Sequence, residues 1–532
     1  MPGTWTQFCA TDDTVLSHLR LAPRCAGKPH RVPGEVKLGV FPCRDGANDV
    51  CVWGPTAGSV AVRSGGETTP LQRDGEYWRG SFSGEDYVFV VDGTEWPDPC
   101  SRWQPDGVRG SSRVLDTTAF EWRDANWPGL SLDELVIYEL HVGTFSDEGM
   151  FAGVEPRLAA LREFGVTAIE LMPVATFPGE RGWGYDGLYT YAAHEAYGGP
   201  RGLAHLVDAA HAAGLGVILD VVYNHVGPGN EALRAFGPYF TDRHATFWGD
   251  AIDYAQRGVR EWAIQNAEQW VRDFHIDGLR LDAVHAIFDD SEPHVCAELA
   301  TRVRDVDPRA LVISEMELGD WRPIEEWGHD AQWFDATHHE LHVLLTGEQD
   351  GYHAGFGSVV ALADDLRGAG HDPRRLVVCA QNHDQVGNRA LGDRLPEDAL
   401  RVAAAVTLFS PCTPLLFMGE EHFETAPFQF FTDHFDPAIA EATREGRKKE
   451  FESFASFSGQ DVPDPQAVET FLRSKLHPAE PDPLYRELLA LRRELPRELV
   501  AEADESRRVL TLRRGSVELV ADFGNRTVEL RV

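Results

Sequence analysis

The sequence is poor in positive charge. Its 532 residues include 49 lysines and arginines but 85 aspartates and glutamates, which gives a formal net charge of −36 at pH 7. Such an excess of negative charge repels phosphate groups, so it argues against binding to nucleic acid or to an anionic membrane surface. A solvated acidic surface is the ordinary explanation for the charge itself.

Cysteine is scarce as well, and its eight copies form no C-x-x-C pair. Cys296 and Cys379 lie in apolar runs, where buried free thiols are expected. No apolar run approaches the length of a membrane span, and residues 1–33 lack a basic stretch followed by an apolar one. We therefore expect a cytoplasmic protein without a metal ion, without a cofactor and without a membrane partner.

The part of the chain after an irregular extension (residues 1–33) is rich in short strand patterns. Between residues 34 and 118, apolar alternation broken by turn residues predicts strands at 35–41, 49–53, 59–63, 77–82 and 87–91. Strands of this length and spacing are typical of a small immunoglobulin-like β-sandwich. Residues 119–133 read as a linker to the next domain.

From residue 134 the pattern changes to apolar strands that alternate with helices. Eight strands are expected, at residues 136–145, 168–174, 216–225, 278–285, 311–316, 332–334, 376–383 and 414–419. Eight strand–helix units in one run predict an α/β fold, a (β/α)8 TIM barrel over residues 134–496, with insertions at 226–253 and 423–483. Three further strand patterns predict a short C-terminal β domain over residues 497–532.

Four of the predicted barrel strands end in polar residues that a packed core would not contain. They place at the strand ends Asp220, Asn224, His225, Arg280, Asp282, Glu315, His383 and Asp384. In a TIM barrel the carboxyl ends of all strands meet at one mouth, so these side chains should share a pocket.

Glycosidic bond cleavage is a reaction that requires such a set. One carboxyl must be protonated near neutral pH, and crowding among acids raises its pKa, while a second must be ionised, as Asp282 would be beside Arg280. Structural ion pairs or a bound divalent cation are the alternative explanations. Convergence of the whole set argues against the first, and the presence of an arginine argues against the second.

These strand ends resemble the four signature regions of the α-amylase family of retaining glycoside hydrolases. The matching motifs are DVVYNH at 220–225, GLRLDAVH at 278–285, the segment centred on Glu315, and QNHD at 381–384. The resemblance implies that Asp282 is the nucleophile, Glu315 the acid/base and Asp384 the transition-state stabiliser. The expected substrate contacts are Tyr185, Asp186, His225, Trp248, Arg280, His285, Asp335, His338, His339, Asn382, His383, Gln385 and Asn388.

Longer motifs are similar to the trehalohydrolase subgroup of this family. They include QNHDQVGNR at 381–389, LLFMGEE at 415–421 and PFQFFTDH at 427–434. This similarity implies hydrolysis of the α-1,4 bond next to the trehalose end of malto-oligosyltrehalose, with trehalose as one product. It also implies a functional pairing with malto-oligosyltrehalose synthase.

Residues 332–339 (QWFDATHH) depart from the subgroup, in which Asn-Asp-Asp-Phe is expected at 334–337. We expect the loop formed by the divergent residues 334–337 to lie on the leaving-group side of the site. Glu317 is a rival to Glu315 as the acid, because both face the same side of a strand, and the position of the strand end favours Glu315.

Two other functions fit the same residues. A glycogen branching enzyme would use the same three carboxylates but exclude water, and a non-catalytic glucan-binding protein would have no need of a protonated acid. Several aromatic residues could be sugar platforms, although core packing is the commoner role of each. Trp248 is the best platform candidate, and the others are Trp183, Phe428, Phe430 and Phe431.

Overall fold

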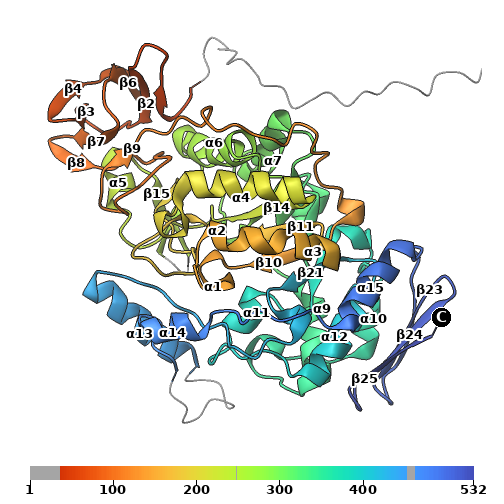
Figure 1. The fold of residues 1–532 in the computed structure, drawn as a ribbon. Coiled ribbons are helices and arrows are strands. Elements are labelled where there is room, and N and C mark those ends of the chain that lie inside the picture. The colour runs from red at the N-terminus through yellow and green to blue at the C-terminus, as the bar shows by residue number, and fades with distance from the viewer. Residues whose placement is uncertain (1–35, 247–248, 452–461, 532) are drawn as a thin grey trace, which may run out of the picture.

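The computed structural model describes residues 36–246, 249–451 and 462–531 (Figure 1). The extension predicted at residues 1–33, and Trp248 as a predicted sugar platform, lie outside these ranges. Within them, no helix combines the length and the apolar character needed to cross a membrane.

The first domain consists of two antiparallel sheets, as predicted for a β-sandwich. One has the order β1 (Gly39–Pro42), β2 (Asn48–Trp53), β6 (Tyr77–Phe82), β5 (Gln72–Asp74). The other has the order β4 (Glu67–Pro70), β3 (Val60–Ser64), β7 (Asp86–Val91), β8 (Thr94–Trp96), with β9 (Ser112–Arg113) also on β7. The sequence missed β4 and β5 because both are largely exposed and lack apolar alternation.

Eight parallel strands form a closed barrel, which confirms the predicted (β/α)8 architecture. They are β10 (Ile137–Leu140), β11 (Ala168–Leu171), β14 (Gly216–Val221), β17 (Gly278–Leu281), β18 (Leu311–Ser314), β19 (Ala331–Trp333), β20 (Leu376–Cys379) and β21 (Thr413–Phe417). Pairing of β10 with β21 closes the barrel. Every residue of these strands is buried, as expected where helices cover a parallel sheet.

Helices follow the strands in the chain. The longer ones are α3 (Leu158–Phe164), α4 (Gly199–Ala213), α6 (Arg257–Asp273), α7 (Val295–Val306), α9 (Asp335–Thr346), α10 (Val359–Leu366), α12 (Glu397–Phe409) and α15 (Pro483–Glu494). The start of α15 shows how the sequence fixes such a helix: Pro483 occupies the first helical position, and the side chain of Asp482 accepts a hydrogen bond from the backbone N–H of Leu484 at 2.9 Å.

Shorter helices lie mainly in the loops at the barrel rim. They are α1 (Val142–Phe145), α2 (Phe151–Val154), α5 (Glu231–Phe236), α8 (Arg322–Glu325), α11 (His383–Gly387) and α14 (Val468–Arg473). The longer α13 (Pro437–Phe451) belongs to the 423–483 insertion. Single 3₁₀ turns are η1 (Leu132–Glu134), η2 (Glu155–Arg157), η3 (Glu195–Tyr197), η4 (Val284–Ala286), η5 (Gly351–His353), η6 (Pro373–Arg375) and η7 (Glu420–His422). A hairpin of β12 (Ala175–Thr176) and β13 (Tyr189–Ala193) follows β11.

Several barrel strands are shorter than predicted at their carboxyl ends. Strands four and seven were expected to reach residues 285 and 383, but β17 ends at Leu281 and β20 at Cys379. Beyond Leu281 the chain turns sharply, and Ala283 adopts a left-handed conformation with φ of 40°. Alternation of apolar and polar residues continues through the turn, so the sequence pattern could not locate the strand end.

The 226–253 insertion joins the sandwich to the barrel. It contains α5 and the hairpin of β15 (Phe240–Thr246) and β16 (Gly249–Ile252). Trp53 of the sandwich packs edge-on against Tyr239 of the insertion, with ring centroids 5.1 Å apart. The Trp53 indole also lies over Gly258 of α6. A Cβ added at Gly258 would come within 2.3 Å of the indole, so only glycine allows the ring to lie this close to the helix.

The C-terminal β domain has four strands rather than the three predicted. These are β22 (Val500–Asp504), β23 (Val509–Arg514), β24 (Val517–Asp522) and β25 (Thr527–Arg531), paired in that order. In Figure 1 this sheet and the N-terminal sandwich lie on opposite sides of the barrel.

Candidate active site

The guanidinium of Arg280, on β17, is the centre of the polar cluster at the barrel mouth. The side chain is fully buried, and its Nη1 lies 2.7 Å from Asp220 Oδ2 and 2.9 Å from Asp282 Oδ1. Its Nη2 lies 2.7 Å from Glu315 Oε2. One cation thus faces three carboxylates, so the cluster retains negative charge with which it can stabilise a positively charged reacting carbon.

Strand register brings these groups together. Asp220 of β14 stands directly beside Arg280 of β17. Asp282 and Glu315 each follow the last residue of a strand, and their backbone N–H groups donate to Val221 and Leu281, which extends the ladder by one residue. The turn at Ala283 then directs its own N–H to Glu315 Oε2 at 2.9 Å. The Glu315 carboxylate is therefore held by a guanidinium and a backbone amide.

Asp384 lies at the start of α11, next to His383. The His383 ring has Nδ1 2.6 Å from Glu139 Oε1 and Nε2 3.4 Å from Asp384 Oδ2. Burial opposes the positive charge, but Asp384 and Glu139 outweigh it and raise the pKa of His383 to about 10. His383 is consequently an imidazolium at neutral pH, pointed at the third catalytic candidate.

The acids of the cluster hold protons unusually well. Burial raises the pKa of Asp220 to about 7, although Arg280 opposes the shift. Burial, with further contributions from Glu315 and Asp384, raises the pKa of Asp335 to about 7. Burial also raises the pKa of Asp384, against the effect of His383. Proton transfer at this site is therefore feasible near neutral pH.

Asp282 is oriented by a chain of hydrogen bonds. The Nδ2 of Asn224 donates to Asp282 Oδ2 at 2.6 Å, and the Nδ1 of His225 lies 2.5 Å from Asn224 Oδ1. Burial lowers the pKa of His225 to about 4, so this ring is neutral at pH 7. A carboxylate held on both sides, by Asn224 and Arg280, has a fixed direction of attack.

Tyr185 forms one wall of the site. Its hydroxyl donates to Asp220 Oδ2 at 2.7 Å, and its ring stacks on His383 with centroids 5.3 Å apart. The preceding Gly184 has φ of 99°, and an added Cβ would lie 2.1 Å from the carbonyl oxygen of Pro173. This glycine-dependent turn places Tyr185 at the mouth.

The other aromatic candidates pack inside the protein. Trp183 is buried, stacks on Phe428 at 5.1 Å and donates from its indole nitrogen to the carbonyl of Gln429. Phe428 and Phe431 are fully buried, and Phe430 is half-buried against the Trp183 ring. Packing thus accounts for these rings, as the sequence favoured.

Besides His383, three predicted contact residues lie on α11 or next to it. Asn382 is buried and caps the helix by accepting from the N–H of Gln385 at 2.7 Å. Asn388 is exposed and donates to Asp384 Oδ1 at 2.9 Å. Gln385 is half-buried beside Asp384 in the chain. Asn382 and Asn388 therefore bear directly on the geometry of Asp384.

The remaining predicted contacts are more peripheral. The Asp186 Oδ2 lies 3.3 Å from His434 Nε2, and His285 is exposed on the turn after β17. Residues 334–339 were expected to form a loop, but Asp335 begins helix α9, with His338 and His339 in its first turns. The reason is that Asp335 favours the start of a helix and an apolar, histidine-rich face follows at helical spacing, signals that we did not weigh in the sequence.

Sequence reasoning missed two acids inside the barrel. Glu139 of β10 accepts from both Nδ1 and the backbone N–H of His383. Glu170 of β11 is fully buried, and burial together with Glu139 and Asp220 raises its pKa well above the ordinary value. A charged residue within an apolar strand was the available signal, and it was applied to other strands but not to these two.

Comparison with known proteins gives matches over most of the chain. Residues 112–248 match the family described as "Alpha amylase, catalytic domain". The chain is 45% identical to the malto-oligosyltrehalose trehalohydrolase of Deinococcus radiodurans, over 87% of this chain and 84% of that one. It is 41% identical to the malto-oligosyltrehalose trehalohydrolase of Rhizobium sp., over 91% and 92%. Among solved structures, an α-amylase candidate from Salmonella typhimurium superposes with a TM-score of 0.83 at 36% identity, over 91% of this chain and 92% of that one.

Proposed function

Because the chain belongs to the malto-oligosyltrehalose trehalohydrolases of the α-amylase family, we propose that the Arg280 cluster hydrolyses the α-1,4 bond next to the trehalose end of a malto-oligosyltrehalose. The observation that carries the mechanism is the contact of one guanidinium with both Asp282 and Glu315. Sharing one cation keeps the two carboxyls close, as a retaining mechanism with a separation of about 5–5.5 Å requires.

In the first step Glu315, in its protonated form, donates its proton to the glycosidic oxygen as the bond to the anomeric carbon breaks. The Asp282 carboxylate attacks that carbon and forms a glycosyl ester, and trehalose leaves. Asp384, which accepts from Asn388 and faces His383, stabilises the positive charge that develops on the sugar.

In the second step Glu315, now ionised, takes a proton from water. The oxygen of that water adds to the anomeric carbon and the ester bond to Asp282 breaks, which restores both carboxyls. Two inversions give net retention, so the malto-oligosaccharide is released as the α-anomer.

The two other functions receive less support. The curated relatives that cover most of this chain carry the trehalohydrolase name, which favours hydrolysis over branching. A glucan-binding protein would gain nothing from acids whose pKa values lie near 7, such as Asp220 and Asp335.

We further propose that the enzyme acts in the cytoplasm, paired with a malto-oligosyltrehalose synthase. In support, the six described cysteines are free thiols and five of them are buried, a pattern typical of a reducing compartment. The pairing follows from the substrate, because a preceding reaction must convert the reducing end of an α-1,4-glucan into trehalose.

Comparison of maltotriosyl-trehalose with maltopentaose tests this function, because both contain five glucose units. We expect free trehalose from the capped substrate and a much higher kcat/KM for it. A site with polar groups arranged for the trehalose hydroxyls leaves them unpaired when maltopentaose binds. Equal kcat/KM values would indicate a general α-glucanase, and new α-1,6 linkages would indicate a branching enzyme.

A further inference from the structure

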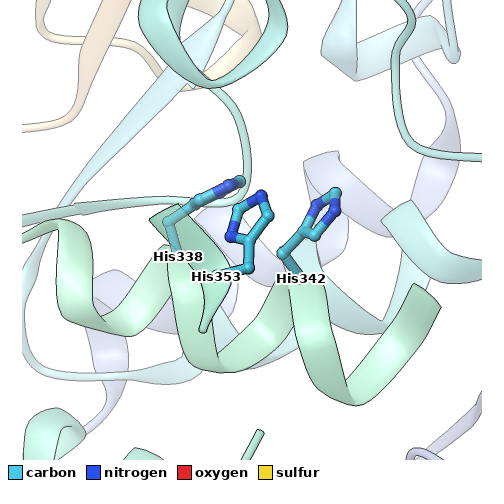
Figure 2. A group of neighbouring side chains, drawn as sticks. All are labelled: His338, His342 and His353. Atoms are coloured by element: carbon cyan, nitrogen blue, oxygen red, sulfur yellow. The ribbon is translucent and has the colours of Figure 1, made fainter. Parts of the chain in front are cut away.

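Three histidines gather beside the start of α9. His338 and His342 lie one helical turn apart on the same face, and His353 comes from the turn η5 (Figure 2). One nitrogen from each ring lies within 4.8 Å of the other two. Figure 2 shows the ring of His353 between the other two, and it stacks on His342 with centroids 4.1 Å apart.

Hydrogen bonds determine which ring nitrogens carry protons. The Nδ1 of His338 lies 2.8 Å from the carbonyl oxygen of Ala380, which can only accept, so Nδ1 is the donor and Nε2 carries a lone pair. Nε2 is buried and has no hydrogen-bond partner among the residues that the structure describes. His338 itself is 2% exposed, so a lone pair is held in the interior without a donor.

His342 is arranged in the same way. Its Nε2 lies 2.9 Å from Glu348 Oε2, and because a carboxylate only accepts, Nε2 is the donor and Nδ1 carries the lone pair. Arg389 Nη1 lies 3.3 Å from the same Nε2, but the guanidinium is directed at Glu348 and Asp393, at 2.8 and 2.7 Å. Glu348 thus orients the His342 ring and offsets the nearby positive charge.

We propose that His338, His342 and His353 form a binding site for a divalent transition-metal ion such as Zn²⁺. The ligands are Nε2 of His338, Nδ1 of His342 and one nitrogen of His353, with water at the remaining position. Metal-bound histidines characteristically donate their second N–H to a carbonyl or a carboxylate, as His338 and His342 do here. Neutral imidazole is a ligand that Zn²⁺ prefers, and three such ligands are sufficient for an open site.

The protonation states agree with this geometry. Burial, with the neighbouring His342, lowers the pKa of His353 to about 3. Burial and the neighbouring histidines lower the pKa of His338 well below its ordinary value. Both rings are therefore neutral at pH 7, so an ion does not have to displace protons from them.

Coordination requires a small rearrangement. Zn–N distances of about 2.0–2.1 Å demand that the three nitrogens move closer together. The rings of His342 and His353 are within 14° of parallel, so one must tilt for both lone pairs to meet a single ion. His353 is only half-buried and belongs to a single turn, whereas His338 and His342 are buried on a helix, so His353 is the ring that moves.

Metal titration of the untagged full-length protein tests the site. The protein is treated with a chelator, dialysed, and titrated with Co²⁺ and Zn²⁺, and metal content, the visible Co²⁺ spectrum and Tm are measured. We expect one ion per chain, a spectrum typical of nitrogen ligands and a rise in Tm with metal concentration. His353→Gln should weaken binding by roughly 100-fold or more, and Glu348→Gln by roughly 10–100-fold.

His205→Gln is the matched control, because His205 is an exposed histidine on α4 and should not affect binding. Circular dichroism of each metal-free variant verifies the fold, and Glu348→Gln keeps the test valid if His353→Gln does not fold. Absence of binding by the wild-type protein would refute the site. Equal binding by wild type, His353→Gln and Glu348→Gln would refute it too, because the ion would then be bound elsewhere.

Discussion

Two buried arginines in this protein have similar acidic partners, but the pKa values of those partners shift in opposite directions. Arg280 contacts Asp220, Asp282 and Glu315 at the barrel mouth. Arg260 of α6 contacts Asp289 at 2.5 Å and Glu298 of α7 at 2.6 Å. At the mouth the pKa of Asp220 is raised to about 7. Around Arg260 the pKa values of both acids are lowered.

The two clusters differ in how far hydrogen bonds and ion pairs compensate for the burial of the acids. Burial opposes the charge of Asp289 and of Glu298, but hydrogen bonds from Ser291 and Arg260 to the first, and from Arg260 and Arg257 to the second, outweigh it. At the mouth, Arg280 is shared by three carboxylates, and its effect on Asp220 does not overcome that of burial. A fully paired cluster is structural, and an incompletely paired one retains protons that can be transferred.

The largest predicted effect separates the two clusters by activity. Asp282→Asn and Glu315→Gln keep the size of the side chain and remove the charge or the proton, so each should lower kcat by roughly 10⁴-fold. Initial rates of trehalose release measure this. Glu298→Gln in the Arg260 cluster is the comparison variant, and a comparable loss of kcat there would contradict the division into catalytic and structural clusters.

The next largest effect is expected on stability, and it concerns the Arg260 cluster. Arg260→Met leaves Asp289 and Glu298 without their shared cation, so the free energy of unfolding should fall by about 3–5 kcal/mol, measured in urea at pH 7. Arg63→Ala, which removes a half-exposed pair with Glu95, should change it by less than about 1 kcal/mol. Similar losses for the two variants would contradict a stabilising role of burial at Arg260.

The pH dependence of stability should also differ. The pKa of Asp335 is about 7 in the folded protein and near 3.8 in the unfolded protein. The stabilisation that comes from its protonation is therefore complete below pH 3.8, decreases as the pH rises, and is lost once the pH has passed through 7. Between pH 5 and 8 the unfolding free energy of Asp335→Asn should therefore fall less than that of the wild type, by about 3 kcal/mol.

The contribution of Asp289 to the unfolding free energy changes with pH in the opposite direction. Its pKa is lowered on folding, so its contribution is present above the unfolded value and is lost as the pH falls below about 3.8. Urea unfolding at several pH values measures both trends. Parallel curves for Asp335→Asn and the wild type between pH 5 and 8 would show that Asp335 does not hold a proton near neutrality.

The smallest effect is expected at Glu317, the rival acid. Glu317 is exposed two residues beyond Glu315, which contacts Arg280. Glu317→Gln should change kcat by less than about threefold, since the side chain lies outside the buried cluster. A loss of several powers of ten in this variant, with Glu315→Gln active, would reverse the assignment of the acid.

Local sequence patterns were sufficient to predict the barrel architecture. Strand and helix periods located all eight barrel strands, and the motifs at 278–285 and 381–384, with the segment centred on Glu315, placed Asp282, Asp384 and Glu315 at strand ends. The reason is that a buried parallel strand needs a continuous apolar run, so charged residues at its end are conspicuous. Short exposed strands such as β5 have no such constraint and were missed.

The chemistry of the side chains depended on tertiary contacts. From the sequence we expected Arg280 to pair with Asp282 alone. In the structure its guanidinium contacts Asp220, Asp282 and Glu315. The raised pKa of Asp335 and the imidazolium state of His383 likewise arise from groups on other strands and helices. A pKa is set by burial and by charges within a few ångströms, and neither can be read from separation along the chain.

The histidine cluster shows the same division. His338 and His342 are four residues apart, but the segment was expected to form a loop, and only the fold brings His353 between them and leaves Nε2 of His338 without a donor. Sequence determined which residues could carry the chemistry, because apolar periodicity fixes the strands and helices that bear them. Tertiary structure decided which of them meet, because proximity and burial depend on how those elements pack.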